Sequence, residues 1–374
     1  MSFQELVPEH LRGLGPYAAG KSVKRAQAES GIECVKLASN ENPFGPSPAA
    51  MEAIRAGADQ VNFYPDNDES ALVTALAAKH ELARDQILVT AGSTSFLDVI
   101  CRTLLGPGLN AVTSSRSFIQ YPLLTRAAGG HLVEAPMQDD RFDLQAVLRA
   151  ITPATRVVFV ANPNNPTGTL LQPGEIDLFL ERVPRNLLVV LDEAYADFAA
   201  GFAGPRNLEY SHSERYVREG RQVLVLRTFS KAHGLAGLRV GYGFGSAEVI
   251  SVFARVRTIF SVSGLAEAAA LAALSDHTHI SRVLHNNAQG AEWLLRELQA
   301  LGLRALPTWA NFVYFDVPEP ARELADRLQL EGVIVRPLTA WGAPSSIRVS
   351  IGTPEQNELF IRALQRCLAA VSAH

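Results

Sequence analysis

Short apolar runs alternate with helical patterns between residues 87 and 245, and this alternation restricts the possible folds more than any other feature of the sequence. The strongest runs are rich in β-branched residues: Ile87–Thr90, Arg156–Val160, Leu187–Leu191 and Val223–Leu226, with weaker runs at Ala111–Thr113 and His131–Val133. Helical patterns such as Thr94–Leu105 and Gly174–Arg182 separate several of them. Continuous apolar strands joined by helices are buried on both faces, so the pattern predicts an α/β fold with a largely parallel sheet.

The chain changes in character from about residue 265 and there predicts a second, smaller α+β unit. A stretch rich in alanine and leucine predicts one long helix that ends near Leu301. The elements expected after it are a strand at Asn311–Phe315, a helix at Pro320–Leu330, an extended piece at Val333–Arg336, a strand at Ile347–Ser350 and a C-terminal helix. We therefore expect an N-terminal arm and part of the small domain in residues 1–45, a large domain in 46–265 and a small domain in 266–374.

Composition excludes several classes of protein. The 374 residues are 47% hydrophobic and 19% charged, which is typical of a globular chain long enough for two domains. The net charge is −4 without a basic block, so we expect no binding to nucleic acid or to an anionic membrane surface. No apolar run approaches the roughly 20 residues that span a bilayer, and no signal peptide is visible. Cys34, Cys101 and Cys367 form no CxxC motif, which favours reduced thiols and a cytoplasmic location.

The stretch ILVTAGSTSF (Ile87–Phe96) runs from a strand through a polar turn into a helix. Backbone N–H groups and hydroxyls at a helix N-terminus can bind an anion, typically a phosphate. Ser93 and Thr94 are therefore candidate phosphate ligands. An ordinary helix cap would explain the same residues, and this stretch alone favours the cap.

Two further strands end in polar side chains that could face a ligand. In ANPNNPTGTL (Ala161–Leu170), two prolines fix an extended bend from which Asn165 can offer its amide. In LLVVLDEAYADF (Leu187–Phe198), Asp192 follows five apolar residues, where a carboxylate is costly unless a positive group meets it. A simple turn and a helix cap are the alternatives. The position at strand ends favours a ligand, because open α/β sheets bind ligands there.

Lys231 lies between an apolar run and a series of glycines in RTFSKAHGLAGLRVGYG (Arg227–Gly243). Most lysines in loops are solvated, and that is the alternative for this one. However, Thr228, Ser230 and Arg239 lie close to it in sequence and could bind a phosphate. A dinucleotide fingerprint is a weak interpretation of the glycines, because they do not follow a strand and open a helix in the required order.

Together these residues describe one ligand. It carries a phosphate for the hydroxyls and Arg239, and a protonated ring nitrogen for Asp192. It also carries a phenolic oxygen for Asn165 and Tyr195, and an electrophilic carbon for the amine of Lys231. Pyridoxal 5′-phosphate has all four features.

The motifs that carry these residues resemble those of fold-type I aminotransferases, and within them the histidinol-phosphate aminotransferase family. The matching stretches are NPNNPTG, DEAYADF, TFSKAHGLAGLRVGYG, PYAAGKSV, LASNENPFGPSP, FYPD, ANFVYF, GVIVRPL and IRVSIGTPEQN. The resemblance implies a pyridoxal-phosphate-dependent transferase of fold type I. Its large domain has a mostly parallel central sheet flanked by helices, and its smaller domain is α+β. It also implies a cytoplasmic enzyme of histidine biosynthesis that uses a small-molecule amino donor and a 2-oxo acid.

The resemblance assigns roles to the residues around the cofactor. Lys231 is the catalytic residue, which holds the cofactor as a Schiff base and later moves a proton as general base and acid. Asp192 pairs with the ring nitrogen, Asn165 and Tyr195 bond the ring hydroxyl, and Phe118 stacks on the ring. The residues that hold the phosphate are Ser93, Thr94, Thr228, Ser230 and Arg239. Tyr64 matches a tyrosine that reaches the phosphate from a partner subunit, which implies a homodimer with shared active sites.

Substrate recognition is assigned to a second set of residues by the same resemblance. Arg348 matches the arginine that binds the anionic group of the substrate, because a bidentate guanidinium suits a carboxylate or a phosphate. The other matching positions are Tyr17, Asn42, Asn311 and Arg336. A second arginine favours a phosphate over a carboxylate alone, whereas a surface arginine at a strand end is the alternative for Arg336.

Three departures from the family pattern leave questions open. Hydroxyl residues stand in the phosphate turn where many relatives have an acid. His233 replaces an aromatic residue and could pack or touch the cofactor phosphate. Trp341 is bulkier than the residue that many relatives have, and it could reshape the substrate pocket near Arg336. His277 and His279 are spaced poorly for a shared metal ion, so we predict no metal site.

The leading hypothesis is therefore transamination between histidinol phosphate and 2-oxoglutarate. An aromatic amino-acid aminotransferase of the same subgroup is the main alternative, because it shares nearly every motif. A decarboxylase of a phosphorylated amino acid that uses the same cofactor is more remote. A non-catalytic regulator that binds the cofactor is disfavoured, because no basic helix-turn-helix pattern precedes the aminotransferase motifs.

Overall fold

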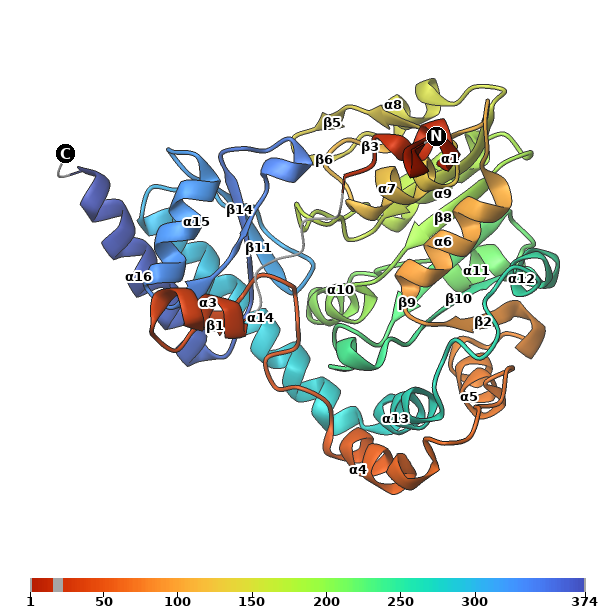
Figure 1. The fold of residues 1–374 in the computed structure, drawn as a ribbon, viewed down its shortest axis with the longest axis horizontal. Helices are drawn as coiled ribbons and strands as arrows, with labels where there is room; N and C mark the ends of the chain where they lie inside the picture. Colours follow the sequence, from red (N-terminus) through yellow and green to blue (C-terminus); the bar gives the residue numbers. More distant parts are fainter. Residues whose placement is uncertain (1, 16–22, 373–374) are drawn as a thin grey trace.

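The computed structural model describes residues 2–15 and 23–372, which form a large and a small unit side by side (Figure 1). The large unit is built on a seven-stranded sheet with the order β2-β10-β9-β8-β7-β3-β4. Its strands are β2 (Ile87–Thr90), β3 (Asn110–Ser114), β4 (His131–Ala135), β7 (Thr155–Ala161), β8 (Leu188–Asp192), β9 (Val223–Thr228) and β10 (Gly241–Gly245). Only β10 runs antiparallel to its neighbours, so the sheet is mostly parallel, as the apolar runs predicted.

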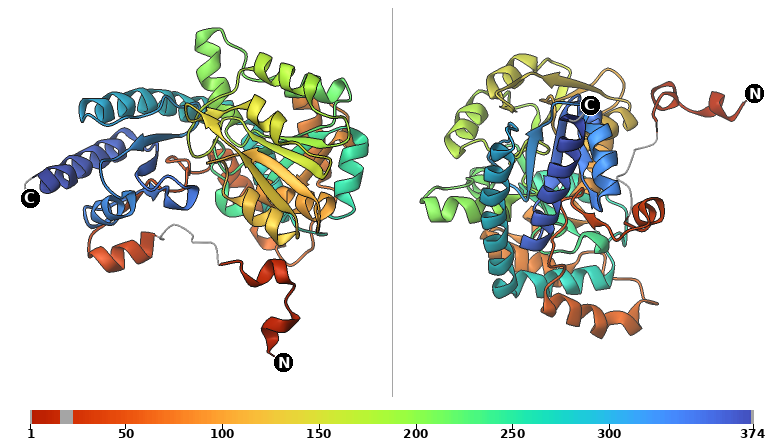
Figure 2. Two further views of the ribbon diagram at one scale, coloured as in Figure 1. Left: turned by 90° about the horizontal axis from the view of Figure 1, so that it is seen from above. Right: turned by 90° about the vertical axis from the view of Figure 1, so that its left-hand side faces the viewer.

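Helices cover both faces of this sheet (Figure 2). The helices of the large unit are α4 (Pro48–Gly57), α5 (Ser70–His80), α6 (Ser93–Leu104), α7 (Gln120–Ala127), α8 (Leu144–Ala150), α9 (Pro173–Arg182), α10 (Ala196–Ala203), α11 (Ser213–Arg218), α12 (Ala247–Ala254) and α13 (Gly264–Ser275). The short strands β5 (Met137–Gln138) and β6 (Arg141–Phe142) form a separate hairpin. Two short helices, α1 (Phe3–Leu6) and α2 (Glu9–Arg12), begin the chain, and α2 lies near α7.

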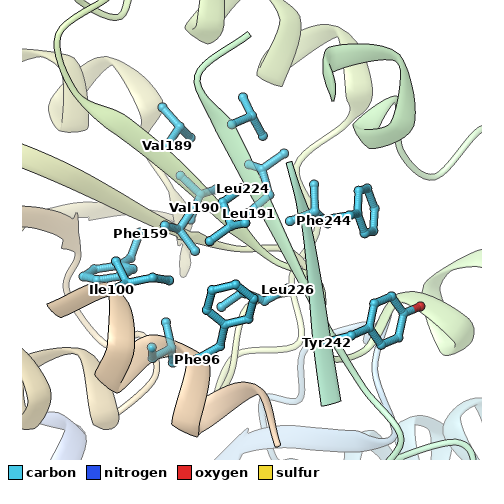
Figure 3. Close-up of a cluster of buried hydrophobic side chains, with 14 of the residues drawn as sticks. Phe96, Ile100, Phe159, Val189, Val190, Leu191, Leu224, Leu226, Tyr242 and Phe244 are labelled. Carbon is cyan, nitrogen blue, oxygen red and sulfur yellow. The ribbon is translucent and has the colours of Figure 1, made fainter. Parts of the chain in front are cut away.

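The core between α6 and the sheet fixes the strand ends that carry the polar residues (Figure 3). Phe96 and Ile100 of α6 are fully buried, as are Phe159 of β7 and Leu226 of β9. Each side chain of this size contributes about 1.5 to 3 kcal/mol when it is buried completely. Truncating Phe96 to alanine would cost about 3 to 5 kcal/mol, because neighbouring side chains cannot refill the space fully.

The small unit is a three-stranded antiparallel sheet with the order β11-β14-β13, packed against long helices. Its elements are β11 (Phe312–Asp316), β13 (Arg336–Pro337), β14 (Ser346–Ser350), α14 (His277–Ala300), α15 (Ala321–Leu330) and α16 (Pro354–Ser372). The N-terminal segment joins this unit, because β1 (Val35–Lys36) pairs in parallel with β12 (Val333–Ile334). The helix before it, α3 (Val23–Ser30), lies near α15.

One sequence expectation about the helices is wrong. The single helix expected from residue 265 to Leu301 is two helices, α13 and α14, which are separated at Asp276. The side chain of Asp276 accepts a hydrogen bond of 3.0 Å from the backbone N–H of His279 and caps α14. Alanines of α13 belong to the core of the large unit, where α13 packs against α4. The domain boundaries stay a proposal, and this packing favours a boundary near residue 276 over one at 265.

No helix within residues 2–15 and 23–372 is both long enough and apolar enough to cross a lipid bilayer.

Candidate active site

A cavity of about 290 Å³ lies at the carboxyl ends of the central strands, where it is lined by residues of both units. The large unit supplies Ser93, Thr94, Phe118, Ile119, Ala161, Pro163, Asn165, Asp192, Ala194, Tyr195, Thr228, Ser230, Lys231, Ala236 and Arg239. The N-terminal segment supplies residues 38–41, and the small unit supplies Arg336, Trp341 and Arg348. Most of the side chains that the sequence indicated therefore meet in one place, at the edge where parallel sheets commonly bind ligands.

Lys231 faces this cavity just beyond the end of β9. Its Nζ donates a hydrogen bond of 3.1 Å to the backbone carbonyl of Ser39, and it lies 5.8 Å from the ring centre of Tyr195. Burial lowers the pKa of Lys231 to about 7, and the positive charges of Arg348 and Arg239 act in the same direction. A large fraction of this amine is therefore neutral near pH 7 and able to act as a nucleophile or base.

Asp192 is the last residue of β8, and its carboxylate is almost fully buried. Tyr121 donates a hydrogen bond of 2.9 Å to its Oδ2, and the backbone N–H of Ala194 lies 3.3 Å from its Oδ1. Burial raises the pKa of Asp192 to about 6, although both hydrogen bonds oppose the increase. At pH 7 and above the group is mostly ionised, so it can pair with a cationic N–H group of a ligand.

Hydroxyl and guanidinium groups also line the cavity. Ser93 and Thr94 begin the twelve-residue helix α6, and Thr228 Oγ1 donates a hydrogen bond of 3.0 Å to Ser230 Oγ. Arg239 donates a hydrogen bond of 2.7 Å to the backbone carbonyl of Ala236. Free N–H groups at a helix start, hydroxyls and a guanidinium together form the chemistry of a phosphate site.

Two glycines allow these groups to approach one another. Gly92 has a φ of +86°, and a Cβ atom there would lie 2.6 Å from Nη2 of Arg239. A Cβ atom on Gly241 would lie 2.6 Å from the backbone nitrogen of Ser93. Any larger residue at either position would displace a group of the candidate phosphate site, which explains why glycine stands there.

Asn165 and Tyr195 line the cavity between Asp192 and the small unit. The side-chain oxygen of Asn165 accepts a hydrogen bond of 2.5 Å from Nη1 of Arg348. The hydroxyl of Tyr195 accepts one of 2.8 Å from the amide of Asn40. Burial raises the pKa of Tyr195, so its hydroxyl keeps its proton and remains able to donate to a ligand oxygen.

Two arginines of the small unit lie next to each other at the cavity. Arg336 of β13 and Arg348 of β14 are directly opposite in the register of the two strands. Arg348 is buried and also donates a hydrogen bond of 2.8 Å to the backbone carbonyl of Ala38. The guanidinium of Arg336 lies 5.1 Å from the ring centre of Trp341. Two adjacent positive charges favour a ligand that carries a negative group at this end of the cavity.

Other residues that the sequence indicated lie outside the cavity lining, and their roles stay predictions. Asn42 is held by a hydrogen bond of 2.8 Å to the backbone carbonyl of Ala232, beside Lys231. Asn311 donates one of 3.0 Å to the carbonyl of Asn40. Tyr64 is 84% exposed and contacts Phe260, with 5.0 Å between the ring centres. Tyr17 falls outside the described residues.

The histidines that the sequence singled out also lie away from the cavity lining. The ring of His233 is buried 4.9 Å from the ring of Phe229, and burial lowers its pKa. It therefore packs as a neutral side chain. His279 lies 3.2 Å from the backbone carbonyl of Gly45. Within the described part of the chain, no three His, Cys, Asp or Glu side chains gather in a way that could hold a metal ion.

Sequence reasoning missed two residues that shape the site. Tyr121 orients the carboxylate of Asp192 and stacks on Phe159, with 4.7 Å between the ring centres. Asn40 joins the hydroxyl of Tyr195 to Ser350, since Ser350 Oγ donates to its side-chain oxygen over 3.1 Å. Asn40 lies in LASNENPFGPSP, one of the stretches that matched the family, and Tyr121 lies three residues after Phe118; these positions were the available signal.

A family model described as aminotransferase class I and II matches residues 32–364. The chain belongs to this family of aminotransferases. Two relatives are 42% and 44% identical to it and share nearly their whole length with it. They are a histidinol-phosphate aminotransferase of Moorella thermoacetica, over 96% of this chain and 92% of the relative, and histidinol-phosphate aminotransferase 2 of Pseudomonas aeruginosa, over 98% and 99%. This aminotransferase therefore also belongs to the histidinol-phosphate aminotransferase family, as its motifs predicted.

The solved structures confirm the predicted fold class. The histidinol-phosphate aminotransferase of Sinorhizobium meliloti, determined in complex with pyridoxal-5′-phosphate, superposes with a TM-score of 0.88 at 29% sequence identity. The match covers 98% of each chain. The aminotransferase described here therefore has the same two-unit architecture, with the mostly parallel sheet in the large unit.

Proposed function

We propose that this protein is a pyridoxal-phosphate-dependent aminotransferase that transfers the amino group of histidinol phosphate to 2-oxoglutarate. In the balanced reaction, the donor carbon becomes a ketone while 2-oxoglutarate becomes glutamate. The observation that carries the proposal is the position of Lys231, whose amine has a pKa of about 7 and faces a cavity that also holds Arg336 and Arg348. A neutral amine suits the chemistry, and the paired arginines suit a substrate that ends in a phosphate.

The residues of the cavity fit the cofactor. Ser93, Thr94, Thr228, Ser230 and Arg239 would hold its phosphate, and the absence of a side chain at Gly92 lets Arg239 approach the start of α6. Asp192 would hold its ring nitrogen, while Asn165 and Tyr195 would bond its ring oxygen. When bound, pyridoxal phosphate supplies an electron sink for the charge that develops at the substrate Cα.

The protein side chains supply the proton transfer and the electrostatics. The Nζ of Lys231 removes the proton from the Cα of the amino donor. In the second half of the reaction it gives a proton to the Cα of the amino acid formed from the acceptor. Because its pKa is low, Lys231 can both accept and release a proton near neutral pH. The ionised carboxylate of Asp192 keeps the opposing nitrogen protonated, and Tyr121 keeps that carboxylate in place. The aromatic side chain of Phe118 forms part of the cavity wall and helps to exclude water.

Substrate binding is proposed to depend on the two arginines. Arg348 is fixed by Asn165 and Ala38, so its guanidinium is already oriented before the substrate arrives. Arg336 adds a second positive charge at the adjacent position of the sheet. A phosphate can pair with both guanidinium groups, whereas the carboxylate of phenylalanine needs only Arg348. Aromatic donors remain the second candidate, because Phe118 and Trp341 give the cavity two aromatic walls.

A homodimer is proposed to complete each site. Several large apolar side chains are exposed on the single chain near Tyr64, namely Val61, Phe63, Ile259 and Phe260. Exposed apolar groups of this kind favour burial against a partner. Tyr64 would then reach the cofactor phosphate of the second subunit. We also propose a cytoplasmic location, since Cys34, Cys101 and Cys367 are free and buried rather than joined in disulfides.

A substrate panel tests the proposed reaction. The purified, cofactor-loaded enzyme would be assayed with histidinol phosphate, phenylalanine and tyrosine as donors and 2-oxoglutarate as acceptor. We expect kcat/KM for histidinol phosphate to exceed that for either aromatic amino acid by at least tenfold. A preference of tenfold or more for phenylalanine would instead establish the aromatic aminotransferase. Lys231→Ala is the matched control, and it should abolish activity towards every donor together with the absorbance band of the bound cofactor.

A further inference from the structure

Trp341 stands between the active-site cavity and a second cavity of about 560 Å³. The second cavity is lined by residues 113–117 after β3, together with Pro122, Glu134, Ala340 and Gly342. Phe118, Ile119 and Trp341 line both cavities. The two cavities therefore adjoin at these three residues, of which Trp341 has the largest side chain.

The indole is held firmly by its surroundings. Trp341 ends a short 3₁₀ turn, Thr339–Trp341, and its backbone N–H donates a hydrogen bond of 2.9 Å to the carbonyl of Leu338. The side chain is only 8% exposed and packs in a cluster with Tyr314, Leu338 and Ala343. A side chain enclosed on several sides keeps one rotamer, so the position of the wall is fixed.

The same indole holds an arginine at the cavity. The guanidinium of Arg336 lies 5.1 Å from the centre of the Trp341 ring, within the range of a cation–π contact. This contact opposes a repulsion, because Arg336 is directly opposite Arg348 in the paired strands. The ring therefore helps to hold the Arg336 side chain beside the second arginine and the cavity.

We propose that Trp341 determines which amino donors the enzyme accepts. Its ring face keeps Arg336 directed at the negative group of the donor, and its bulk closes the cavity behind that group. A compact donor that ends in a phosphate is thereby favoured, and a larger donor without a phosphate is excluded. This inference rests on the proposed function and adds the side chain that sets the donor preference.

Two substitutions distinguish the effect of the aromatic ring face of Trp341 from the effect of its size. Trp341→Phe keeps an aromatic face but attracts a cation less strongly, so KM for histidinol phosphate should rise about threefold to tenfold while kcat stays within twofold. Trp341→Ala removes both, so KM for histidinol phosphate should rise at least thirtyfold. The same variant should raise kcat/KM for tryptophan as donor, because the wall towards the second cavity is open.

A binding measurement complements the kinetics. Inorganic phosphate would be titrated as a competitive inhibitor of the cofactor-loaded enzyme, with phenylalanine as the donor. We expect its inhibition constant to increase at least tenfold in Trp341→Ala. Trp309→Phe is the matched control, because Trp309 lies under Arg206 at 4.9 Å but lines neither cavity. It should leave every constant within twofold of the parent enzyme.

The results distinguish this inference from the proposed function. If the parent enzyme prefers histidinol phosphate and Trp341→Phe leaves the ratio of kcat/KM between histidinol phosphate and phenylalanine within twofold, the role of Trp341 is refuted and the function stands. If the parent enzyme prefers phenylalanine, both are refuted. Melting temperature and cofactor absorbance show whether each variant is folded. Should Trp341→Ala fail to fold, Trp341→Phe alone decides the outcome.

Discussion

Tyr121 donates a hydrogen bond of 2.9 Å to Oδ2 of Asp192, and the two residues come from separate elements of the large unit. Asp192 ends a buried strand, while Tyr121 lies in α7 and stacks nearly flat on Phe159, with 6° between the ring planes. The tyrosine ring is fully enclosed, so its hydroxyl has little freedom to leave the carboxylate. The orientation of the acid is therefore set before a ligand binds.

Replacing Asp192 by asparagine should lower kcat/KM by about a hundredfold to a thousandfold, because the amide cannot stabilise a positive charge in the buried site. Steady-state kinetics with saturating cofactor measure this effect. Tyr121→Phe is the graded control. It removes one hydrogen bond worth about 1 kcal/mol, so kcat/KM should fall only about fivefold. Equal activity of Asp192→Asn and the parent enzyme would contradict the assigned role.

The pKa of Lys231 predicts how the cofactor-free protein captures pyridoxal phosphate at different pH values. The neutral amine is the reactive form, and burial lowers the pKa of Lys231 to about 7 from the ordinary lysine value of 10.5. The capture rate should therefore rise as pH increases from 6 and level off above about pH 8, where an ordinary lysine would still be almost fully protonated. Stopped-flow absorbance at several pH values measures the profile. A rate that continues to rise up to pH 10 would show that the pKa is not lowered.

The two arginines should respond differently to a change to lysine. Arg348 uses two nitrogens to bond Asn165 and Ala38, and a lysine cannot reproduce this geometry. We expect Arg348→Lys to raise KM about a hundredfold for histidinol phosphate and for glutamate alike. Arg336→Lys should raise KM mainly for histidinol phosphate. Measuring KM for both donors with each variant tests the distinction, and equal effects of Arg336→Lys on the two donors would argue against a phosphate contact.

Asp140 connects the two units and should contribute to thermal stability. Its buried carboxylate pairs with Arg116 over 2.7 Å and with Arg304 of the small unit, which also contacts Asp316. Asp140→Asn should lower Tm by about 2 °C, which corresponds to roughly 1 kcal/mol because both arginines are partly exposed. Asp316→Asn leaves the link between the units in place and should have a smaller effect. Scanning calorimetry of the two variants compares them directly.

The exposed aromatic residues should become buried in a dimer. Phe260→Asp places a charge beside Tyr64 and is expected to shift the protein towards monomer in light scattering after size-exclusion chromatography. Cofactor affinity should fall in the same variant, because Tyr64 would no longer reach the partner site. Phe3→Asp is a control, since Phe3 is exposed in α1 and is assigned no contact with the partner. A dimer that tolerates the charge at Phe260 would contradict this placement.

Local patterns predicted the strands and the chemistry of the large unit well. β2 has the bounds that its apolar run indicated, and Lys231, Asp192 and Asn165 meet in one cavity because parallel strands end at one edge of the sheet. The antiparallel direction of β10 was not predicted, because the local pattern of a strand does not reveal whether it runs parallel or antiparallel to its neighbours. The break at Asp276 was overlooked because a helical pattern continues on both sides of it.

Contacts between residues that are far apart in the sequence could not be predicted from local patterns. The hydroxyl of Tyr195 meets Asn40, which is 155 positions away, and no local pattern encodes such a pairing. The contact between Arg336 and Trp341 depends on the turn that separates two short strands. The proposed role of Tyr64 involves a second chain, so its place in one subunit shows only an exposed ring.

The hydrogen bond between Asn40 and Ser350 joins positions that are 310 residues apart. Strand β1 likewise pairs with β12, which is synthesised near the end of the chain. A ribosome adds about 5 to 20 residues each second, so the first of these partners leaves the exit tunnel some 15 to 60 s before the second. The central sheet, by contrast, is complete once β10 has been made. The nascent chain can therefore assemble its large unit during translation, while β1 remains without its partner strand until synthesis is nearly finished. Chaperones that bind unpaired N-terminal segments would meet this enzyme during that interval.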